Sequence, residues 1–532
     1  MKCDVVTLTV IFFILSNYCN DVASSYKILA VFPFPSKSHY AIPDPLLMRL
    51  VELGHEVTVY THYPKKENNI PNYKDIDIGH CFPALTPLLT MDSSATLGSS
   101  LFLRLYVTFF TDLFTTLDEC EPLIELLNST EKYDVFLTEA FATDAMLMYA
   151  WKFNIPAITV VPNVMLPWLS SRMGNPHNPA YVTNYMLSDY YWKEMSFLEK
   201  TKNTILYGLS LGLYKYGTSR NDDVVIHKQL ESAPSVEELI RNVSLLFVSS
   251  NSVINAPIPL VPAVVDIGGI HIKPSRRVPE NIEKFINESK HGVVYFCMGS
   301  LLRGETFPPE KREAFLYAFS KIPQRVLWKW EGDVLPGKSD NIMISKWMPQ
   351  RDILAHPNVK LFISHGGLLG TSEAVYEGVP VLGIPIFGDQ RTNIKSLEAN
   401  GAGELLDYNE ISKEVVLEKI QRLLNDPKYK ENAKLLSDRY RDRPMSPLDT
   451  AVYWTEYVIR HKGAPHLRTA AADMPWYQYL LLDVIAFIVA VLVAGLLIIY
   501  YTTKFILRAI YGLICGGGAK KGSSKSDKKK RN

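Results

Sequence analysis

The chain has 532 residues, more than one hydrophobic core usually serves, so we expect at least two domains. Its 56 Lys and Arg residues nearly balance its 55 Asp and Glu residues, and a formal net charge of +1 provides no basic field for binding nucleic acid. A hydrophobic content of 47% is ample for globular cores, and part of it is concentrated at the two ends of the chain.

Residues 1–24 have the features of a secretory signal peptide. Lys2 precedes an apolar run over residues 5–15, and small residues near Ala23 offer a cleavage point. A buried first strand is the alternative, but the next strand pattern begins independently at Lys27. We therefore expect the chain to enter the secretory pathway.

The segment 25–253 alternates strand and helix patterns, which is typical of an α/β domain. Its first strand, helix and second strand together predict a βαβ unit, and similar strands recur further along the chain. The expected elements are a strand at 26–35, a helix at 42–54, and strands at 55–61, 133–139 and 156–163.

A proline-bearing stretch, INAPIPLVPAV at 254–264, is the expected linker to a second domain at 265–462. Strands rich in Val, Ile and Leu alternate with helices there, which favours a parallel sheet covered on both faces. We therefore predict two doubly wound, Rossmann-like domains that face each other across a cleft. The expected strands are 291–300, 324–332, 341–347, 359–367 and 380–388, with helices at 309–320 and within 413–460.

The run from Leu480 to Tyr501 is long and apolar enough to cross a bilayer about 30 Å thick as one helix. A juxtamembrane segment at 463–479 precedes it, and aromatic residues at both ends of the run suit the membrane interface. Basic residues in the tail at 502–532 place that tail in the cytosol. This pattern predicts a single-pass, type I protein with both domains in the lumen.

Two short motifs agree with that topology. Sequons for N-glycosylation occur at Asn128, Asn242 and Asn287, on the lumenal side of the predicted span. Lys529 and Lys530 resemble the dilysine retrieval signal of endoplasmic-reticulum membrane proteins, although a simple basic stop-transfer flank is the alternative. We expect residence in the endoplasmic-reticulum membrane.

Three of the six cysteines, Cys81, Cys120 and Cys297, lie in the predicted lumenal part. An odd, widely spaced trio indicates neither a disulfide scaffold nor a metal cluster, and no spacing of His, Cys and Asp suggests zinc. We therefore expect the hydrophobic core to hold the fold, and we expect no bound metal.

The stretch FISHGGLLGTSEAVYEGVPVLGIPIFGDQ, residues 362–390, suggests a ligand site. His365 and the two glycines after it lie between a buried strand and a helix, where backbone N–H groups and the helix dipole attract an anion. Asp389 and Gln390 follow the next apolar strand. Because the stretch contains neither GKS/GKT nor GxGxxG, a phosphate bound in a different manner is the expected guest.

The longer run from Trp347 to Asn393 resembles the signature of the UDP-glycosyltransferases, which transfer sugars from UDP donors to small lipophilic acceptors. The similarity extends over almost the whole chain and is closest to the insect members. It implies a GT-B fold and inverting transfer, with a UDP-sugar, by analogy UDP-glucose, as co-substrate and no other cofactor. It does not choose among phenols, pigments, steroids and plant toxins as acceptors, between oxygen and carbon attack, or between monomer and homo-oligomer.

The resemblance also implies a role for each matching position. An indole offers a broad face for stacking on uracil, and carboxylates and amides bond to hydroxyl groups. The implied roles are Trp347 on uracil, Gln350 on the nucleoside, Glu373 on the ribose, Ser300, His365, Gly367 and Gly370 around the diphosphate, and Asp389 and Gln390 on the sugar.

Transfer to a hydroxyl needs a base, and histidine suits this because its pKa is ordinarily near 6.5. The resemblance assigns this role to His39, in the loop after the first strand. A carboxylate must orient the imidazole, and YDVFLTEAFATDAM offers Glu139 and Asp144. We predict Asp144 as the partner, with Glu139 in reserve.

Leu369 stands where the family commonly has asparagine, so a hydrogen bond is missing or comes from Thr371 or Ser372. This departure supports an alternative, a catalytically silent membrane protein that binds UDP-sugars; a nucleotide-sugar epimerase is a third hypothesis, which the membrane anchor disfavours. The acceptor pocket is expected in the first domain, along 101–114 and 164–173, although both stretches equally suit core or membrane-contacting helices.

Overall fold

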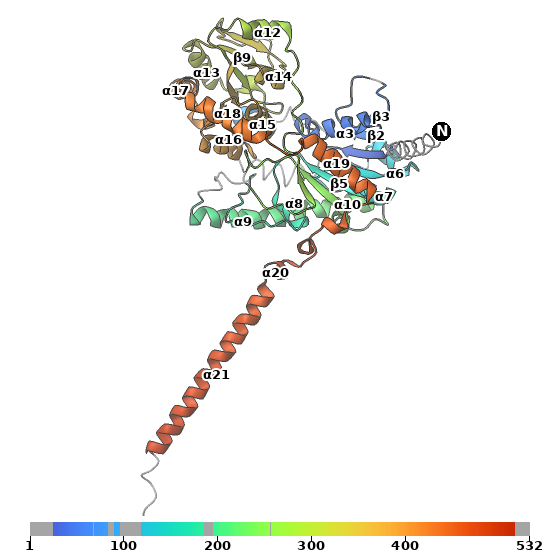
Figure 1. Cartoon of the computed structure of the whole chain (residues 1–532), viewed down its shortest axis with the longest axis vertical. Coiled ribbons are helices and arrows are strands. Elements are labelled where there is room, and N and C mark those ends of the chain that lie inside the picture. Colours follow the sequence, from blue (N-terminus) through green and yellow to red (C-terminus); the bar gives the residue numbers. More distant parts are fainter. Residues whose placement is uncertain are drawn as a thin grey trace, which may run out of the picture. The chain divides into compact units, whose positions relative to one another are not determined.

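The computed structural model describes residues 25–67, 69–82, 90–95, 117, 119–185, 195–255 and 257–515. It has two compact units, residues 1–472 and residues 473–532 (Figure 1). The predicted signal peptide, the stretch 101–114, and Lys529 and Lys530 lie outside the described residues.

The first domain is built on a seven-stranded sheet in the order β3-β2-β1-β4-β5-β6-β7, in which all neighbours are parallel. The central strands are mostly apolar and are buried along their whole length, because helices cover both faces of a parallel sheet and neither alternate set of side chains meets water. The strands are β1 (Lys27–Phe32), β2 (Glu56–Thr61), β3 (Tyr73–Asp77), β4 (Val135–Glu139), β5 (Ala157–Val161), β6 (Val243–Val248) and β7 (Val264–Asp266).

Amphipathic helices cover this first sheet. In α3 (Pro43–Glu52) a proline occupies the first turn, where its missing N–H costs no hydrogen bond, and Leu46, Leu47 and Leu50 face the core. The other helices of the first domain are α2 (Lys37–Tyr40), α6 (Glu121–Asn128), α7 (Leu147–Phe153), α8 (Pro167–Arg172), α9 (Phe197–Leu213), the π-helix η4 (Tyr214–Thr218), α10 (Ser219–Gln229) and α11 (Val236–Arg241).

The second domain is built on a six-stranded parallel sheet in the order β10-β9-β8-β11-β12-β13. Alternate residues of β8 enter two different core clusters: Val294 and Phe296 join one, and Val293 and Tyr295 join the other. Both faces of the sheet are therefore buried, as the strand composition predicts. The strands are β8 (Val293–Cys297), β9 (Arg325–Lys329), β10 (Ile342–Ser345), β11 (Val359–Ser364), β12 (Val381–Gly383) and β13 (Gly403–Leu405).

Helices fill the connections of the second sheet and confirm its alternating pattern. They are α12 (Glu280–Asn287), the 3₁₀ turn η5 (Gly304–Thr306), α13 (Pro309–Ser320), α14 (Gln350–Leu354), α15 (Leu368–Tyr376), α16 (Gln390–Ala399), the 3₁₀ turn η6 (Tyr408–Glu410), α17 (Lys413–Asn425) and α18 (Pro427–Arg441).

The domain boundaries differ from the prediction in two places. Strand β7 starts at the end of the expected linker 254–264 and pairs with β6, so the first sheet continues past residue 264. Helix α19 (Pro447–Arg460) packs on α3 and β6 and belongs to the first core, although its position in the chain suggests the second domain (Figure 1). Its buried face, which includes Ala451 and Val458, suits either core, so periodicity alone does not decide which one it joins.

The second unit contains α20 (Trp476–Tyr479) and α21 (Leu482–Cys515). Helix α21 is long and apolar enough to cross a membrane, with a mean hydropathy of 3.0 in its apolar window. It continues as a regular helix past the predicted end of the span at residue 501, because neither proline nor a polar cluster interrupts it.

A disulfide joins Cys81 to Cys120, which the sequence analysis did not predict. The expectation of no disulfide was wrong because these cysteines are 39 residues apart, and spacing alone does not reveal that their Cα atoms lie 5.2 Å from each other. Cys297 is free and buried. The fold is therefore held by its cores and by one covalent crosslink.

We expect the Cys81→Ser/Cys120→Ser variant to unfold at a lower denaturant midpoint than the wild type. Closing a loop of this length stabilises the folded chain by about 4 kcal/mol, because it restricts the unfolded state. Denaturant titrations with and without a reducing agent measure the effect: reductant should lower the midpoint of the wild type but not that of the variant. An equal shift in both proteins would contradict a stabilising role for the disulfide.

Candidate active site

The candidate site is a cavity of about 470 Å³ within the first unit, lined by residues of both domains. In the first sheet the chain turns to opposite sides at β1 and β4, and in the second at β8 and β11. Ligands of such sheets bind beyond the carboxyl ends of the strands at these switch points. The predicted residues that line the cavity are His39, Ser300, Trp347, Gln350, His365, Gly367, Gly370, Glu373, Asp389 and Gln390.

His39 lies on α2, directly after β1, and Glu139 is the last residue of β4, the neighbour of β1 in the sheet. The ring nitrogen Nδ1 of His39 is 2.5 Å from Oε1 of Glu139. Phe34 stacks on the imidazole at 4.5 Å and Phe141 meets it edge-on at 4.7 Å. Because Glu139 is buried, the ring is held in one orientation by a carboxylate that water barely reaches.

Asp144 does not contact His39, so the prediction of Asp144 as its partner was wrong. This carboxylate is buried and accepts hydrogen bonds from Arg172, at 2.5 Å, and from the hydroxyl of Tyr214. Asp144 follows the strand end by five residues, where the chain has already turned toward α8 and η4. The distance in sequence from the strand end, rather than the residue type, decides which carboxylate reaches the histidine.

A second carboxyl, Asp222, completes this buried cluster. It accepts hydrogen bonds from the Thr143 hydroxyl and from the backbone N–H of Asp144. Burial and the neighbouring charge of Asp144 raise the pKa of Asp222 to about 8. At neutral pH, therefore, Asp144 and Arg172 form an ion pair beside a protonated Asp222.

His365 follows β11 and sits between two glycines. A Cβ atom on Gly299, whose φ is +86°, would lie 2.5 Å from Cε1 of the imidazole, and one on Gly367 would lie 2.5 Å from Nε2. Burial, with a smaller contribution from Lys329, lowers the pKa of His365 to about 4. The ring is therefore neutral at pH 7, with one N–H to donate beside the first turn of α15.

We expect Gly367→Ala to weaken UDP binding at least about tenfold, which corresponds to about 1.4 kcal/mol. The added methyl group occupies the position of the imidazole and forces His365 away from the anion. Gly208→Ala on α9 is the matched control, since its Cβ would meet nothing within 4 Å. Calorimetric titration with UDP measures both variants, and an unchanged affinity in Gly367→Ala would show that the imidazole position does not matter.

Gln350 and Glu373 meet beside the exposed indole of Trp347. Nε2 of Gln350 donates to Oε2 of Glu373 at 2.7 Å, so the amide orients the carboxylate. Burial raises the pKa of Glu373 to about 7, although the bond from Gln350 opposes this shift. The ammonium group of Lys37, on α2 of the first domain, lies 4.0 Å from the ring centre of Trp347.

We expect Glu373→Gln to melt about 2–4 °C higher than the wild type at pH 8, the shift that 1 kcal/mol produces in a domain of this size. The pKa of Glu373 is raised from its ordinary 4.5 to about 7 in the folded protein. Its protonated carboxyl therefore favours folding below pH 4.5, and this contribution to the free energy of unfolding is lost as the pH rises through about 7. Glutamine cannot ionise, so its advantage should disappear at pH 5. Thermal melts at both pH values test this.

Glu431→Gln, on the exposed side of α18, is the control for that measurement and should show no such pH dependence. An advantage of Glu373→Gln that is equal at pH 5 and pH 8 would contradict the raised pKa.

Asp389 and Gln390 lie after β12, at the start of α16. Oε1 of Gln390 accepts from the backbone N–H groups of Ile386 and Phe387, at 2.8 and 3.1 Å. The oxygen of the Gln390 amide is therefore occupied, and only its NH₂ group is left to bond to a ligand. Burial raises the pKa of Asp389 to about 6, while Asn393 and His39 oppose this shift.

Two residues at the site were missed by the sequence analysis. Asn393 donates through Nδ2 to Oδ2 of Asp389 and to the carbonyl oxygen of Gly366, which joins the turn after β12 to the turn after β11. Lys329 is the last residue of β9 and donates to the carbonyl oxygen of Gly299, at 3.0 Å. A lysine at the carboxyl end of a strand, where ligands of parallel sheets bind, was the signal that could have found it.

The predicted substitutes for the missing asparagine are not at the cavity. Leu369 lines it, whereas Thr371 and Ser372 are buried on the other side of α15 and do not. The acceptor stretch 164–173 does not line the cavity either, because Val164, Leu166 and Leu169 are buried in apolar cores. Phe34, Phe141 and Pro162 line the first-domain side instead.

Comparison with known proteins agrees with this site. The family model described as UDP-glucoronosyl and UDP-glucosyl transferase matches residues 103–516. The chain belongs to the UDP-glycosyltransferase family. It is 62% identical over 504 residues to UDP-glycosyltransferase UGT5 of the insect Dactylopius coccus. This alignment covers 94% of this chain and 95% of that protein.

More distant relatives are UDP-glucosyltransferase 2 of Dactylopius coccus, at 39% identity over 96% of this chain and 97% of that protein, and mouse UDP-glucuronosyltransferase 2B17, at 33% over 88% and 92%. Among solved structures, Medicago truncatula UGT71G1 complexed with UDP-glucose superposes with a TM-score of 0.55 at 16% identity, over 83% of this chain and 100% of that one. The glycotransferase of kitacinnamycin gives 0.52 at 17%, over 82% and 98%. The predicted GT-B fold is thereby confirmed.

Proposed function

We propose that this UDP-glycosyltransferase transfers glucose from UDP-glucose to a hydroxyl group of a small lipophilic acceptor, with inversion and with His39 as general base. The observation that carries the proposal is the His39–Glu139 pair, which lies on the same cavity as His365, Asp389 and Gln390. Glucose as the sugar is supported by the name of the relative at 39% identity, UDP-glucosyltransferase 2.

In this mechanism the N–H at Nδ1 of His39 donates a hydrogen bond to Glu139. The imidazole keeps that proton, so Nε2 carries the free electron pair. Nε2 takes the proton from the acceptor hydroxyl as its oxygen forms a bond to the anomeric carbon of glucose. The bond from that carbon to the diphosphate oxygen breaks at the same time, with its electrons going to UDP. Attack opposite the leaving group inverts the anomeric centre, and Glu139 stabilises the imidazolium until the proton passes to solvent.

The leaving diphosphate gains negative charge, and the second domain offers donors for it. His365 is neutral and donates one N–H, and α15 begins at Leu368 with its first backbone N–H groups near Gly367. The buried amine of Lys329 lies close enough to lower the pKa of His365. Asp389 and the NH₂ group of Gln390 serve the hydroxyl groups of the sugar, and Glu373 those of the ribose.

The acceptor side of the cavity is aromatic. Phe34 and Phe141 both contact the His39 ring and also pack edge-on against each other at 5.2 Å, so a flat apolar molecule that enters beside the imidazole replaces water there. This lining supports lipophilic acceptors as a class and favours hydroxyl groups carried on rings.

We expect His39→Ala and Glu139→Gln to lower kcat by about 10²–10⁴ while the KM for UDP-glucose stays nearly unchanged. Each change impairs proton transfer from the acceptor but leaves the residues proposed to bind UDP-glucose unchanged. UDP release, measured with a panel of phenolic acceptors and with UDP-glucose, UDP-glucuronic acid and UDP-N-acetylglucosamine in parallel, gives both constants. Faster turnover with UDP-glucuronic acid than with UDP-glucose would contradict the choice of sugar.

Asp144→Asn is the matched carboxyl control for Glu139→Gln. It weakens the ion pair with Arg172 and should lower the melting temperature, while the kcat of the folded protein stays within a few-fold of wild type. An equal loss of kcat in both variants would argue against Glu139 as the partner of the base. Binding of UDP without turnover of any acceptor would instead support the silent sugar-binding protein.

We place this reaction in the lumen of the endoplasmic reticulum, where it serves the detoxification or modification of secondary metabolites. Support comes from α21, from the lysines near the C-terminus, and from the three sequons, whose asparagines Asn128, Asn242 and Asn287 are all exposed. Loss of mass on treatment with an N-glycosidase, together with protection of the domains from protease in sealed microsomes, tests the topology.

A further inference from the structure

Helix α9 exposes several of its apolar residues. Phe197, Leu198, Ile205 and Leu209 are 81%, 76%, 64% and 41% exposed, and Tyr216, in the π-helical continuation η4, is 75% exposed, whereas Leu211 packs against the first core. A helix on the surface of a soluble domain normally turns such residues toward the core. Beside its half-buried apolar residues, α9 therefore carries an apolar surface that faces outward.

The most deeply buried positions of α9 are polar. They are Asn203 and Ser210, and neither belongs to an apolar cluster. Oδ1 of Asn203 accepts from the backbone N–H of Asn184 at 2.8 Å, and Nδ2 of Asn184 donates to Oγ of Ser210 at 2.8 Å. These bonds set the rotation of the helix, because turning the apolar face inward would break them in a buried environment.

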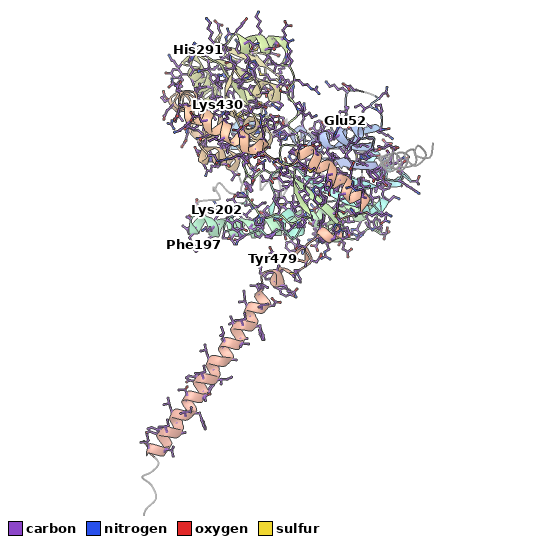
Figure 2. The ribbon with its side chains drawn as sticks, in the orientation of Figure 1. Glu52, Phe197, Lys202, His291, Lys430 and Tyr479 are labelled. Carbon is purple, nitrogen blue, oxygen red and sulfur yellow. A yellow bond between two sulfur atoms is a disulfide. The ribbon has the colours of Figure 1, made fainter. Side chains whose placement is uncertain are left out.

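The exposed apolar residues form one stripe along the helix. Leu198, Ile205 and Leu209 follow one another at intervals of seven and four residues, which places them on the same side of a helix with 3.6 residues per turn, and the exposed Tyr216 follows in η4. Phe197 begins the helix, and Lys202 is exposed beside the stripe (Figure 2). An exposed apolar stripe along one side of a surface helix is the pattern of a helix that lies in a membrane interface.

The place where the chain leaves the first unit supports the same environment. Ala472, the last residue of that unit, packs on Gly174, where a Cβ atom would lie 2.5 Å from its backbone nitrogen. Gly174 directly follows α8, and α8 packs against α9. Residues 473–481 join Ala472 to the start of α21, and even fully extended they reach only about 35 Å.

We infer that the α9 stripe, formed by Phe197, Leu198, Ile205, Leu209 and Tyr216, docks on the surface of the lipid bilayer that α21 crosses. The apolar side chains enter the region between headgroups and acyl chains. The first domain is thereby held against the membrane at a second point besides the covalent tether. This inference rests on α21 as a membrane span and is independent of the sugar, the acceptor and the catalytic base.

The full-length chain, purified and reconstituted in vesicles of phosphatidylcholine and phosphatidylserine, provides the test. Ile205→Cys in a Cys515→Ser background carries an environment-sensitive fluorophore on the stripe, and Val334→Cys, 73% exposed in the second domain, carries it on the control surface. Spin-labelled lipids should quench the probe at position 205 at least about twofold more than the probe at position 334. Equal quenching at the two positions would overturn the inference.

Two further measurements distinguish docking on the bilayer from contact with a second copy of this chain. Adding Leu198→Asp and Tyr216→Asp to the labelled chain should remove the lipid quenching at position 205, whereas retained UDP binding shows that the domains remain folded. Self-quenching of the probe at position 205 that rises with the number of chains per vesicle, without quenching by spin-labelled lipid, would instead assign the stripe to a second copy and would overturn the proposal.

Discussion

The hydrogen bond between His39 and Glu139 depends on parallel pairing at the centre of the first sheet. The strands β1 and β4 are neighbours with the same direction, so the residues that follow one strand meet the last residue of the other. The second sheet repeats this geometry at β8 and β11, where Gly299 and His365 come together. The cavity exists because these two strand-end regions border the same space.

The donor side of the cavity holds titratable groups in an environment that disfavours their charge. Burial lowers the pKa of His365 to about 4 and raises those of Glu373 and Asp389 to about 7 and about 6. Hydrogen bonds orient Glu373 and Asp389, and close packing against two glycines orients His365. Each of the three groups can still form hydrogen bonds to a ligand. The site therefore stores unfavourable desolvation in the free protein, which a polar ligand that bonds to these groups would relieve.

The α9 stripe reverses the usual distribution of polarity at a different place in the same domain. At the active site, polar groups are buried and wait for a polar ligand, while on α9 apolar groups are exposed and face a solvent other than water. Both features conflict with simple burial rules, and both are stabilised locally by hydrogen bonds, from Gln350 to Glu373 and from Asn184 to Ser210. Departures from local consistency of this kind concentrate where proteins function.

The sequence by itself determined the strand and helix alternation, the two sheets and the apolar C-terminal helix, because hydrophobic periodicity is a local property. The family resemblance of one contiguous motif also picked out most second-domain residues that line the cavity. Only the tertiary structure decided that Glu139 rather than Asp144 reaches His39, that Cys81 bonds to Cys120, and that α19 returns to the first core. It also decided that the oxygen of Gln390 is occupied and that α9 turns its apolar side outward. These outcomes depend on which residues, far apart in the chain, become neighbours, and the same residue types and spacings are compatible with several such arrangements.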